Sequence, residues 1–265
     1  MMKLQERTVA SAGCSVHAVR MNLILLQPVE IDAENRVVLN DERAVHIRNV
    51  LKAEGGKKLR IGRLNGPLGI GTVEMADSQQ VVLSCVFEEN LPEKPRVDLL
   101  LAMPRPKVLK RMWAQLAALG VGRIVLVRAE KVERYYFDSH VLEPDFYNRR
   151  LIEGLQQARC THRPGVQIEP RFRPYVEDRL ETDFPGQCKL LADPSGTTRI
   201  RDLQPAENFG RILLAVGPEG GWTPYELDML RARGFELIGM GNRILRTDTA
   251  TIGLLSVLNE YLAGS

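Results

Sequence analysis

The chain has 265 residues, of which 44% are hydrophobic and 26% charged, a composition that excludes a disordered protein, a coiled coil and a collagen-like fibre. At roughly 150 residues per domain, this length favours two domains. The net charge of +3, from 36 basic and 33 acidic residues, is too small to indicate a polyanionic partner by itself. No apolar run approaches the roughly 20 residues that a membrane-spanning helix needs.

The four cysteines are spread along the chain without a C-x-x-C pair, so neither a zinc module nor a disulfide framework is indicated. Reduced thiols, and hence a cytoplasmic protein, are the better interpretation. His46, His140 and His162 are isolated in the sequence, and we expect no metal site. Residues 1–20 lack the continuous apolar segment of a secretory signal, and we expect them to form a disordered extension.

Short apolar runs separated by turn residues follow, and they predict a small β-rich unit over residues 21–89, interpreted as a barrel. The expected strands lie near Asn22–Leu26, Arg36–Leu39, Lys57–Leu64, Gly71–Met75 and Val81–Phe87. One helix interrupts them. Asn40 or Asp41 can cap it, apolar residues recur at helical spacing, and Gly55-Gly56 ends the run.

Residues 88–96 contain two prolines and five charges, which is typical of a linker. The pattern then changes to alternating strands and helices over residues 90–265, which predicts a parallel sheet and an α/β fold. Expected helices cover 108–119 and 145–159, with a last one from about Thr249. Expected strands cover 97–103, 123–127, 166–168, 189–192, 211–216 and 235–240.

Two loops of this α/β unit can carry chemistry. The first, Gly217-Pro218-Glu219-Gly220-Gly221, follows a buried strand and precedes a helix that Thr223 and Glu226 can begin as a capping box. Glycines there allow a ligand to approach the main chain closely, although a tight turn without a ligand explains them equally well. Neither the phosphate-loop nor the dinucleotide signature occurs in the chain.

The second loop, Gly241-Asn242-Arg243-Ile244-Leu245-Arg246-Thr247-Asp248-Thr249-Ala250, lies between a strand end and the last helix. Helix capping explains its threonines and its aspartate. Capping does not explain Arg243 and Arg246, because cations are disfavoured beside a helix N-terminus.

Together the two loops resemble the paired signature of the bacterial small-subunit (16S) ribosomal RNA uracil-N3 methyltransferases, a branch of the SPOUT superfamily. The resemblance covers about residues 21–265. It implies a PUA-like N-terminal β-barrel over residues 21–89 and a trefoil-knotted α/β methyltransferase domain over residues 90–265. It also implies a homodimer that binds S-adenosyl-L-methionine and acts on ribosomal RNA or the small ribosomal subunit.

The resemblance implies a cofactor pocket in which the main chain makes most of the contacts. Its residues would be Leu191, Ala192, Gly217, Pro218, Glu219, Gly220, Gly221, Met240, Gly241, Ile244 and Leu245.

Two stretches depart from the family pattern and leave the target nucleotide open. Residues 114–121 lack the usual lysine and glutamate, and Leu155 replaces the acid of a Glu-Gln pair. A SPOUT methyltransferase for another RNA nucleotide therefore stays an alternative. From a different class, a non-catalytic RNA-binding relative is the other alternative.

A basic stretch between Asp41 and Arg63 carries seven lysines and arginines against three acids. Such a run is typical of a solvated face, but beside a methyltransferase unit it favours phosphate contacts. The expected RNA-binding residues are Arg43, His46, Arg48, Lys52 and Arg159.

Methylation of uracil N3 requires loss of a proton from that nitrogen, and the base must be unpaired. We expect Arg246 to stabilise negative charge on the pyrimidine oxygens. Thr247 or Asp248 would orient Arg246, and Glu219 would accept the proton.

Overall fold

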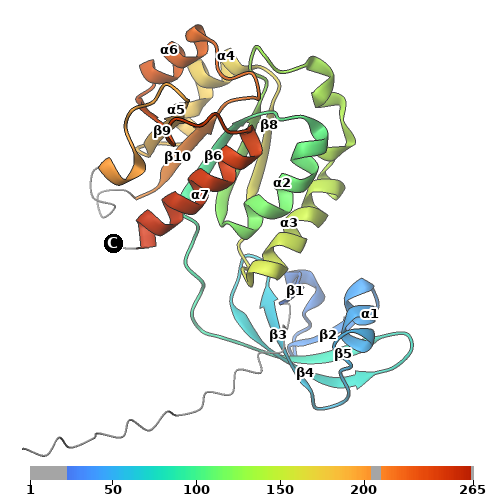
Figure 1. Ribbon diagram of the computed structural model, residues 1–265. Coiled ribbons are helices and arrows are strands. Elements are labelled where there is room, and N and C mark those ends of the chain that lie inside the picture. Colours follow the sequence, from blue (N-terminus) through green and yellow to red (C-terminus); the bar gives the residue numbers. More distant parts are fainter. Residues whose placement is uncertain (1–22, 204–209, 264–265) are drawn as a thin grey trace, which may run out of the picture.

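The computed structural model describes residues 23–203 and 210–263, which form two sheets that lie one above the other in Figure 1. The expectation for residues 1–20 lies outside the described residues. No described helix is long and apolar enough to cross a membrane.

The N-terminal unit of the described chain is a five-stranded sheet in the order β1-β3-β4-β5-β2. A bulge in β4, between Val73 and Met75, bends the sheet. Its edge strands β1 and β2 are not paired with each other in the described residues, so hydrogen bonds leave the sheet open. Its elements are β1 (Ile24–Leu26), η1 (Pro28–Glu30), β2 (Arg36–Leu39), α1 (Glu42–Asn49), β3 (Lys58–Arg63), β4 (Leu68–Ala76) and β5 (Val81–Phe87).

Residues 88–96 carry no helix or strand and connect the two sheets, as the sequence predicts (Figure 1). The second sheet of the described chain has six parallel strands in the order β11-β9-β10-β6-β7-β8. Its strands are β6 (Val97–Ala102), β7 (Val121–Val127), β8 (Gly165–Glu169), β9 (Cys188–Ala192), β10 (Ile212–Val216) and β11 (Phe235–Ile238).

Helices cover both faces of this parallel sheet. Helices α2 (Pro106–Ala118), α3 (Pro144–Ala158) and α7 (Thr247–Ala263) pack on one face, while the shorter α4, α5 and α6 gather on the other side (Figure 1). The remaining helical elements are η2 (Arg134–Asp138), η3 (His140–Leu142), α4 (Phe172–Pro174), η4 (Tyr175–Arg179), α5 (Leu180–Asp183), η5 (Ile200–Asp202) and α6 (Pro224–Ala232).

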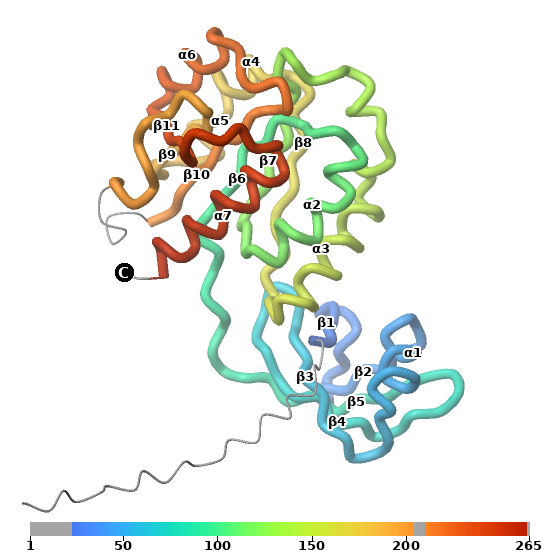
Figure 2. Tube along the Cα trace, viewed as in Figure 1, coloured from blue at the N-terminus to red at the C-terminus, as the bar shows by residue number. Residues whose placement is uncertain are grey.

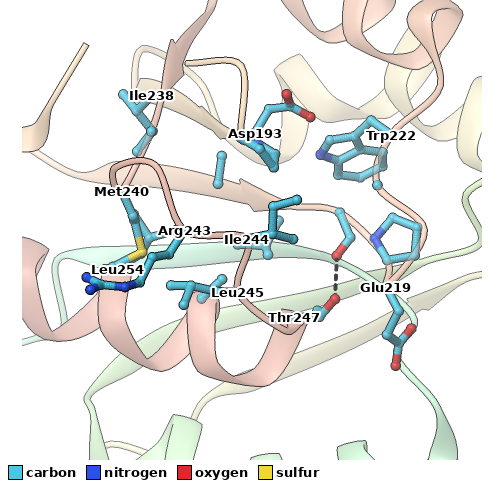
Figure 3. A pocket seen from close by; sticks show the side chains of 18 of the residues that line it. Asp193, Glu219, Trp222, Ile238, Met240, Arg243, Ile244, Leu245, Thr247 and Leu254 are labelled. Carbon is cyan, nitrogen blue, oxygen red and sulfur yellow. Dashed lines mark hydrogen bonds between the residues drawn. The ribbon is translucent and has the colours of Figure 1, made fainter. Parts of the chain in front are cut away.

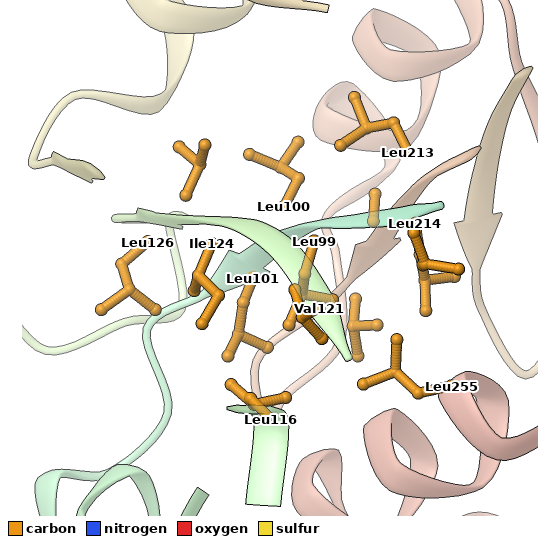
Figure 4. Close-up of a cluster of buried hydrophobic side chains, with 14 of the residues drawn as sticks. Leu99, Leu100, Leu101, Leu116, Val121, Ile124, Leu126, Leu213, Leu214 and Leu255 are labelled. Carbon is orange, nitrogen blue, oxygen red and sulfur yellow. The ribbon is translucent and has the colours of Figure 1, made fainter. Parts of the chain in front are cut away.

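The central strand β6 is buried along its whole length because its side chains alternate between the two covered faces. Leu99 and Leu101 point toward Leu116 of α2 and Leu255 of α7, whereas Leu100 points the other way (Figure 4). The strand predicted over residues 97–103 therefore lies between two helical layers.

The short strand β1 joins the two units because each of its faces belongs to a different hydrophobic core. Ile24 and Leu26 lie in the core of the N-terminal sheet, while Leu25 lies with Leu23 in the core of the parallel sheet. Polar contacts reinforce this junction. The hydroxyl of Thr161 donates to the carbonyl of Gly66 (2.6 Å), and burial keeps Thr161 from exchanging this partner for water.

The helix α1 begins at a side-chain cap, Asp41, which accepts a hydrogen bond from the backbone N–H of Arg43. The guanidinium of Arg43 contacts the carboxylates of Glu30 and Asp41 and donates to the carbonyl of Leu25 (2.8 Å). Burial opposes the charged forms, but hydrogen bonds from Arg43 and from backbone N–H groups, together with the charge of Arg43, outweigh it and lower the pKa of both Glu30 and Asp41. Arg43 is therefore committed to the fold of its own unit.

We predict that Arg43→Met lowers the free energy of unfolding by about 1–3 kcal/mol at pH 7, because two partly buried carboxylates lose their partner. The pKa values of these carboxylates are depressed in the folded state, so the stabilisation is present above their ordinary values of 4.5 and 3.8. It is lost as the pH falls through the folded values. Urea titrations of both proteins from pH 7 to pH 3 should therefore show the difference shrinking.

Arg36→Met is the matched control, since Arg36 pairs with Asp32 on the surface of the same sheet. We expect it to change the free energy of unfolding by less than about 0.5 kcal/mol. An equal loss in both variants would contradict the structural role of Arg43.

Candidate functional site

A cavity of about 240 Å³ lies at the carboxyl ends of β9, β10 and β11. One water molecule needs only about 10–15 Å³ of such space, so there is room for a ligand. Because these strands are parallel, the loops that follow them meet at one edge of the sheet, where α/β folds commonly bind ligands. The lining residues are Ala192, Asp193, Pro194, Val216, Gly217, Pro218, Glu219, Gly220, Gly221, Trp222, Ile238, Gly239, Met240, Gly241, Arg243, Ile244, Leu245, Thr247, Ala250 and Leu254.

The loop after β11 touches the segment after β9 through the main chain. The backbone N–H of Gly239 donates to the carbonyl of Thr198 (3.0 Å). A Cβ on Gly239 would lie 2.1 Å from the carbonyl oxygen of Gly196, so only glycine allows this approach. In Figure 2 the dark red residues between β11 and α7 pass beside the orange segment that follows β9. Two walls of the cavity are thus held together by their backbones.

The loop after β10 is attached to its surroundings at several points. The backbone N–H of Arg105 donates to the Glu219 carboxylate (3.1 Å), and the Lys131 ammonium donates to the carbonyl of Gly220 (2.8 Å). The predicted capping box is confirmed, since Thr223 and Glu226 each accept from the other's backbone N–H. These contacts hold the glycine loop in one position beside the cavity.

Thr247 connects the start of α7 to the same glycine loop. Its hydroxyl donates to the carbonyl of Gly217 (3.2 Å), as the dashed line in Figure 3 shows. The carboxylate of Asp248 accepts from the Arg111 guanidinium (3.1 Å) and from the backbone N–H of Thr249 (2.9 Å). Neither contact involves Arg246, and the role of Thr247 or Asp248 in orienting Arg246 stays a prediction.

The other two predicted catalytic residues, Arg246 and Glu219, differ in their position relative to the cavity. Arg246 is exposed and does not line the cavity, whereas Glu219 lines it but accepts the hydrogen bond from Arg105. Glu219 therefore helps to position the segment that contains Arg105, in addition to any role as a proton acceptor.

The predicted cofactor residues all line the cavity except Leu191. Leu191 is fully buried in the middle strand β9, paired with Ala215 on one side and Leu237 on the other. Its main chain pairs on both sides within the sheet, and it does not line the cavity. On β9 the lining of the cavity begins at Ala192.

Trp222, which was not among the predicted site residues, is 4% exposed and stands at one side of the cavity in Figure 3. Its Nε1 is buried and has no hydrogen-bond partner among the described residues. A buried donor without a partner is costly, so a ligand acceptor there would be favourable. The position of Trp222 directly after the glycine loop is the signal that could have identified it.

Asp193, Pro194 and Arg243 were also not predicted as site residues, although Asp193 adjoins the predicted Ala192 and Arg243 the predicted Ile244. Apolar side chains surround the mouth of the cavity: Ile244 is 87% exposed, Met240 41% and Leu245 36%. Clustered exposed apolar groups beside a cavity indicate that a partly apolar ligand covers them. Among the described residues, no three His, Cys, Asp or Glu side chains form a group that could hold a metal ion.

The predicted RNA-binding residues lie on two parts of the structure. His46 and Arg48 are half-buried on α1, and Lys52 is exposed on the turn after it. Arg159 ends α3 in the left-handed conformation, next to the junction of the two units. Arg43 differs from the others because its guanidinium already contacts the carboxylates of Glu30 and Asp41, and an RNA contact of Arg43 stays a prediction.

Comparisons with known proteins identify relatives of this chain. Residues 92–259 match the model of the RNA methyltransferase domain. A ribosomal RNA small subunit methyltransferase E from Treponema pallidum is 32% identical over 245 residues, which cover 90% of each chain. The Borreliella burgdorferi protein named ribosomal RNA small subunit methyltransferase E 1 is 27% identical over 88% of this chain and 94% of its own length.

Solved structures share the fold. The ribosomal RNA small subunit methyltransferase E from Neisseria gonorrhoeae, described as bound to S-adenosyl methionine, matches with a TM-score of 0.74 at 21% identity. That match covers 91% of this chain and 97% of the other. A probable rRNA methyltransferase from Porphyromonas gingivalis matches with a TM-score of 0.73 at 21% identity, over 92% and 99% of the chains.

The fold of the C-terminal unit is thus that of an RNA methyltransferase domain. The chain belongs to the RNA methyltransferase family, as a relative of the ribosomal RNA small subunit methyltransferases E.

We predict that Gly239→Ala lowers the free energy of unfolding by about 2–4 kcal/mol, because the added methyl group forces the β9 and β11 loops apart. Thermal melting followed by circular dichroism measures the loss. Gly210→Ala is the control, since a Cβ at Gly210 meets nothing within 4 Å. Equal melting temperatures for the two variants would show that the close approach of these loops is not needed.

Proposed function

We propose that the protein methylates a uridine at N3 in small-subunit ribosomal RNA, with S-adenosyl-L-methionine as the methyl donor. The observation that carries the proposal is the cavity in which the two glycine-containing loops of the sequence signature meet. The identity to curated rRNA methyltransferases over 90% of the chain supports the reaction class and the RNA substrate.

The residues of the cavity suit this cofactor. S-adenosyl-L-methionine, when bound, supplies a methyl group on a sulfonium, which is electrophilic. Met240, Ile244 and Leu245 provide apolar surface for an adenine ring, and the backbone of Gly217–Gly221 provides polar groups for the rest. The unpartnered N–H of Trp222 adds a donor. The proposed cofactor residues are Ala192, Gly217, Pro218, Glu219, Gly220, Gly221, Trp222, Met240, Gly241, Ile244 and Leu245.

We extend the proposal to the fold. A trefoil knot in the C-terminal unit is supported by the strand order, in which β10 lies between β9 and β6 although both precede it in the chain. The bent five-stranded sheet supports a PUA-like unit over residues 21–89, and residues 88–96 support a domain boundary there. A homodimer and a cytoplasmic location remain parts of the same proposal.

The RNA would contact both units. His46, Arg48 and Lys52 on and after α1, together with Arg159 at the end of α3, offer positive or polar groups for phosphates. Such contacts provide position and salt-dependent affinity rather than sequence recognition. Arg43 is left out because its guanidinium is held by Glu30 and Asp41.

For the chemistry, the chain must hold N3 of the base in line with the methyl carbon and stabilise the charge that develops when the N3 proton leaves. The exposed guanidinium of Arg246 is free to reach the pyrimidine oxygens of an RNA base. Thr247 and Asp248 position the start of α7 through Gly217 and Arg111. Glu219, beside the cavity, remains the proposed proton acceptor.

Two measurements test the function. Isothermal titration calorimetry with S-adenosyl-L-methionine should show binding, and mass spectrometry of small-subunit rRNA incubated with protein and cofactor should show one methyl group on a uridine at N3. A methyl group on another nucleotide would contradict the uridine assignment. RNA binding without cofactor binding would establish a non-catalytic RNA-binding relative instead.

We predict that Trp222→Phe weakens S-adenosyl-L-methionine binding about five- to tenfold, because the ring stays while the N–H donor is lost. Calorimetry measures the change. Tyr225→Phe, which removes a polar group from an exposed ring on α6, should bind as the wild type does. Unchanged affinity in Trp222→Phe would show that the indole N–H does not contact the cofactor.

We predict that Arg246→Ala retains cofactor affinity and lowers kcat at least about a hundredfold, since one charge-stabilising group is removed. Methyl transfer to small-subunit rRNA at saturating cofactor measures kcat. Arg233→Ala, at the C-terminal end of α6, is the control and should turn over normally. Full turnover in Arg246→Ala would show that this residue does not stabilise the base.

A further inference from the structure

A second cavity, about 340 Å³ in volume, lies beside the first and is formed by the segment after β9 and the loop after β11. Pro194, Gly241, Arg243 and Ile244 line both cavities. A ligand in the second cavity would therefore lie next to whatever occupies the first. The proposed reaction assigns no role to the second cavity.

The polar groups of the second cavity are suited to an anion. Two arginines, Arg199 and Arg243, line it, and none of its lining residues is acidic. Nη1 of Arg199 is buried and has no hydrogen-bond partner among the described residues. Because an unpartnered buried donor of a cation is costly, an anionic oxygen at Nη1 would be strongly favoured.

Asp193 and Asp202 lie close to Arg199 in the sequence. Asp193 accepts from the backbone N–H (2.9 Å) and the hydroxyl (2.6 Å) of Ser195. Asp202 lies near the guanidinium of Arg201, at 3.7 Å. Among the described residues, the two acids closest to Arg199 in sequence therefore have other partners.

The second cavity is held open by backbone contacts. The N–H of Gly196 donates to the carbonyl of Asp193 (3.0 Å), and the N–H of Asp202 donates to the carbonyl of Arg199 (2.9 Å). Thr198 pairs with Ile238 as a parallel bridge beside β11. A site held in this way loses little entropy when a ligand binds.

We propose that this second cavity binds a phosphate of the RNA substrate next to the nucleotide that is methylated, with Arg199 and Arg243 as the donors. The inference rests on the proposed function and adds a contact for the substrate of the same site. Guanidinium groups bind phosphate oxygens through paired N–H donors, which makes arginine the suitable residue for this role. The phosphate would hold the target base beside the methyl donor.

The test is RNA binding by Arg199→Met, in which the charge is lost and most of the side-chain length is kept. Unmethylated small-subunit rRNA is titrated without cofactor at several salt concentrations. We expect about a tenfold loss of RNA affinity at low salt and a decrease of about 1 in the slope of log K against log salt, as for one lost phosphate contact. Affinity for S-adenosyl-L-methionine should stay at the wild-type value.

Arg201→Met is the matched control. Arg201 is two residues away on η5, 85% exposed in its side chain, and does not line the second cavity. We expect wild-type RNA affinity and salt dependence. Arg199→Lys, which keeps the charge but loses the paired donors, should restore the salt slope and only part of the affinity, and this recovery would exclude a folding defect as the cause.

Each outcome decides the proposal. RNA affinity and salt slope unchanged in Arg199→Met would overturn it, and so would a loss equal to that of Arg201→Met. A loss of cofactor affinity would overturn it by assigning the cavity to the carboxylate of the methyl donor. The two proposals can also fail separately. If Arg199→Met loses RNA affinity but the wild-type protein transfers no methyl group, the phosphate site is supported and the proposed function is contradicted.

Discussion

Parallel pairing of β9, β10 and β11 is the constraint on which the whole site depends. In the observed register, Ala192 pairs with Val216 and with Ile238, so the three strands end at the same level of the sheet. Loops separated by more than twenty residues in the sequence therefore meet within one cavity. A slip of one residue in β10 would reverse its two faces and remove the glycine loop from its position beside α7.

The insertion of β10 between β9 and β6 makes this register robust. At the opposite end of the strand, the buried carboxylate of Asp98 on β6 accepts two hydrogen bonds from Arg211, at 2.6 and 3.1 Å. Arg211 precedes β10 directly, so an ion pair anchors one end of the strand while Thr247 contacts Gly217 after the other. Buried charges of this kind are costly unless paired, which favours one pairing of the strands over others.

Features that depend on neighbouring residues could be predicted from the sequence. The bounds of β2 and β5 and the capping box of Thr223 and Glu226 agree with the structure because alternation and capping are local. The helical segment from Phe172 to Asp183 was missed. Its α-helical period is interrupted by a π-helical turn at η4, which removes the regular spacing that would have indicated a helix.

The candidate site was predictable where glycines marked it and not where side chains from distant elements complete it. The glycine loop and Gly241 were recognised from their resemblance to a family, since periodicity alone gives only an α/β unit. Leu254 on α7 lines the candidate site and Arg199 after β9 lines the second cavity. Both positions result from tertiary packing, and the sequence around these residues carries no sign of it. Arg43 is the opposite case. The sequence placed it in a basic stretch expected to bind RNA, whereas in the structure its guanidinium binds Glu30 within its own unit.

The two-sided burial of β1 has a mechanical consequence. Swinging the N-terminal sheet away from the parallel sheet would bring Leu23 and Leu25 into water and break the bond between Thr161 and Gly66. Such a motion is energetically unfavourable, so the basic groups on α1 and the cavity keep a fixed separation. Under the proposed RNA contacts, the three-dimensional shape of the RNA would become a criterion of selection alongside its base sequence.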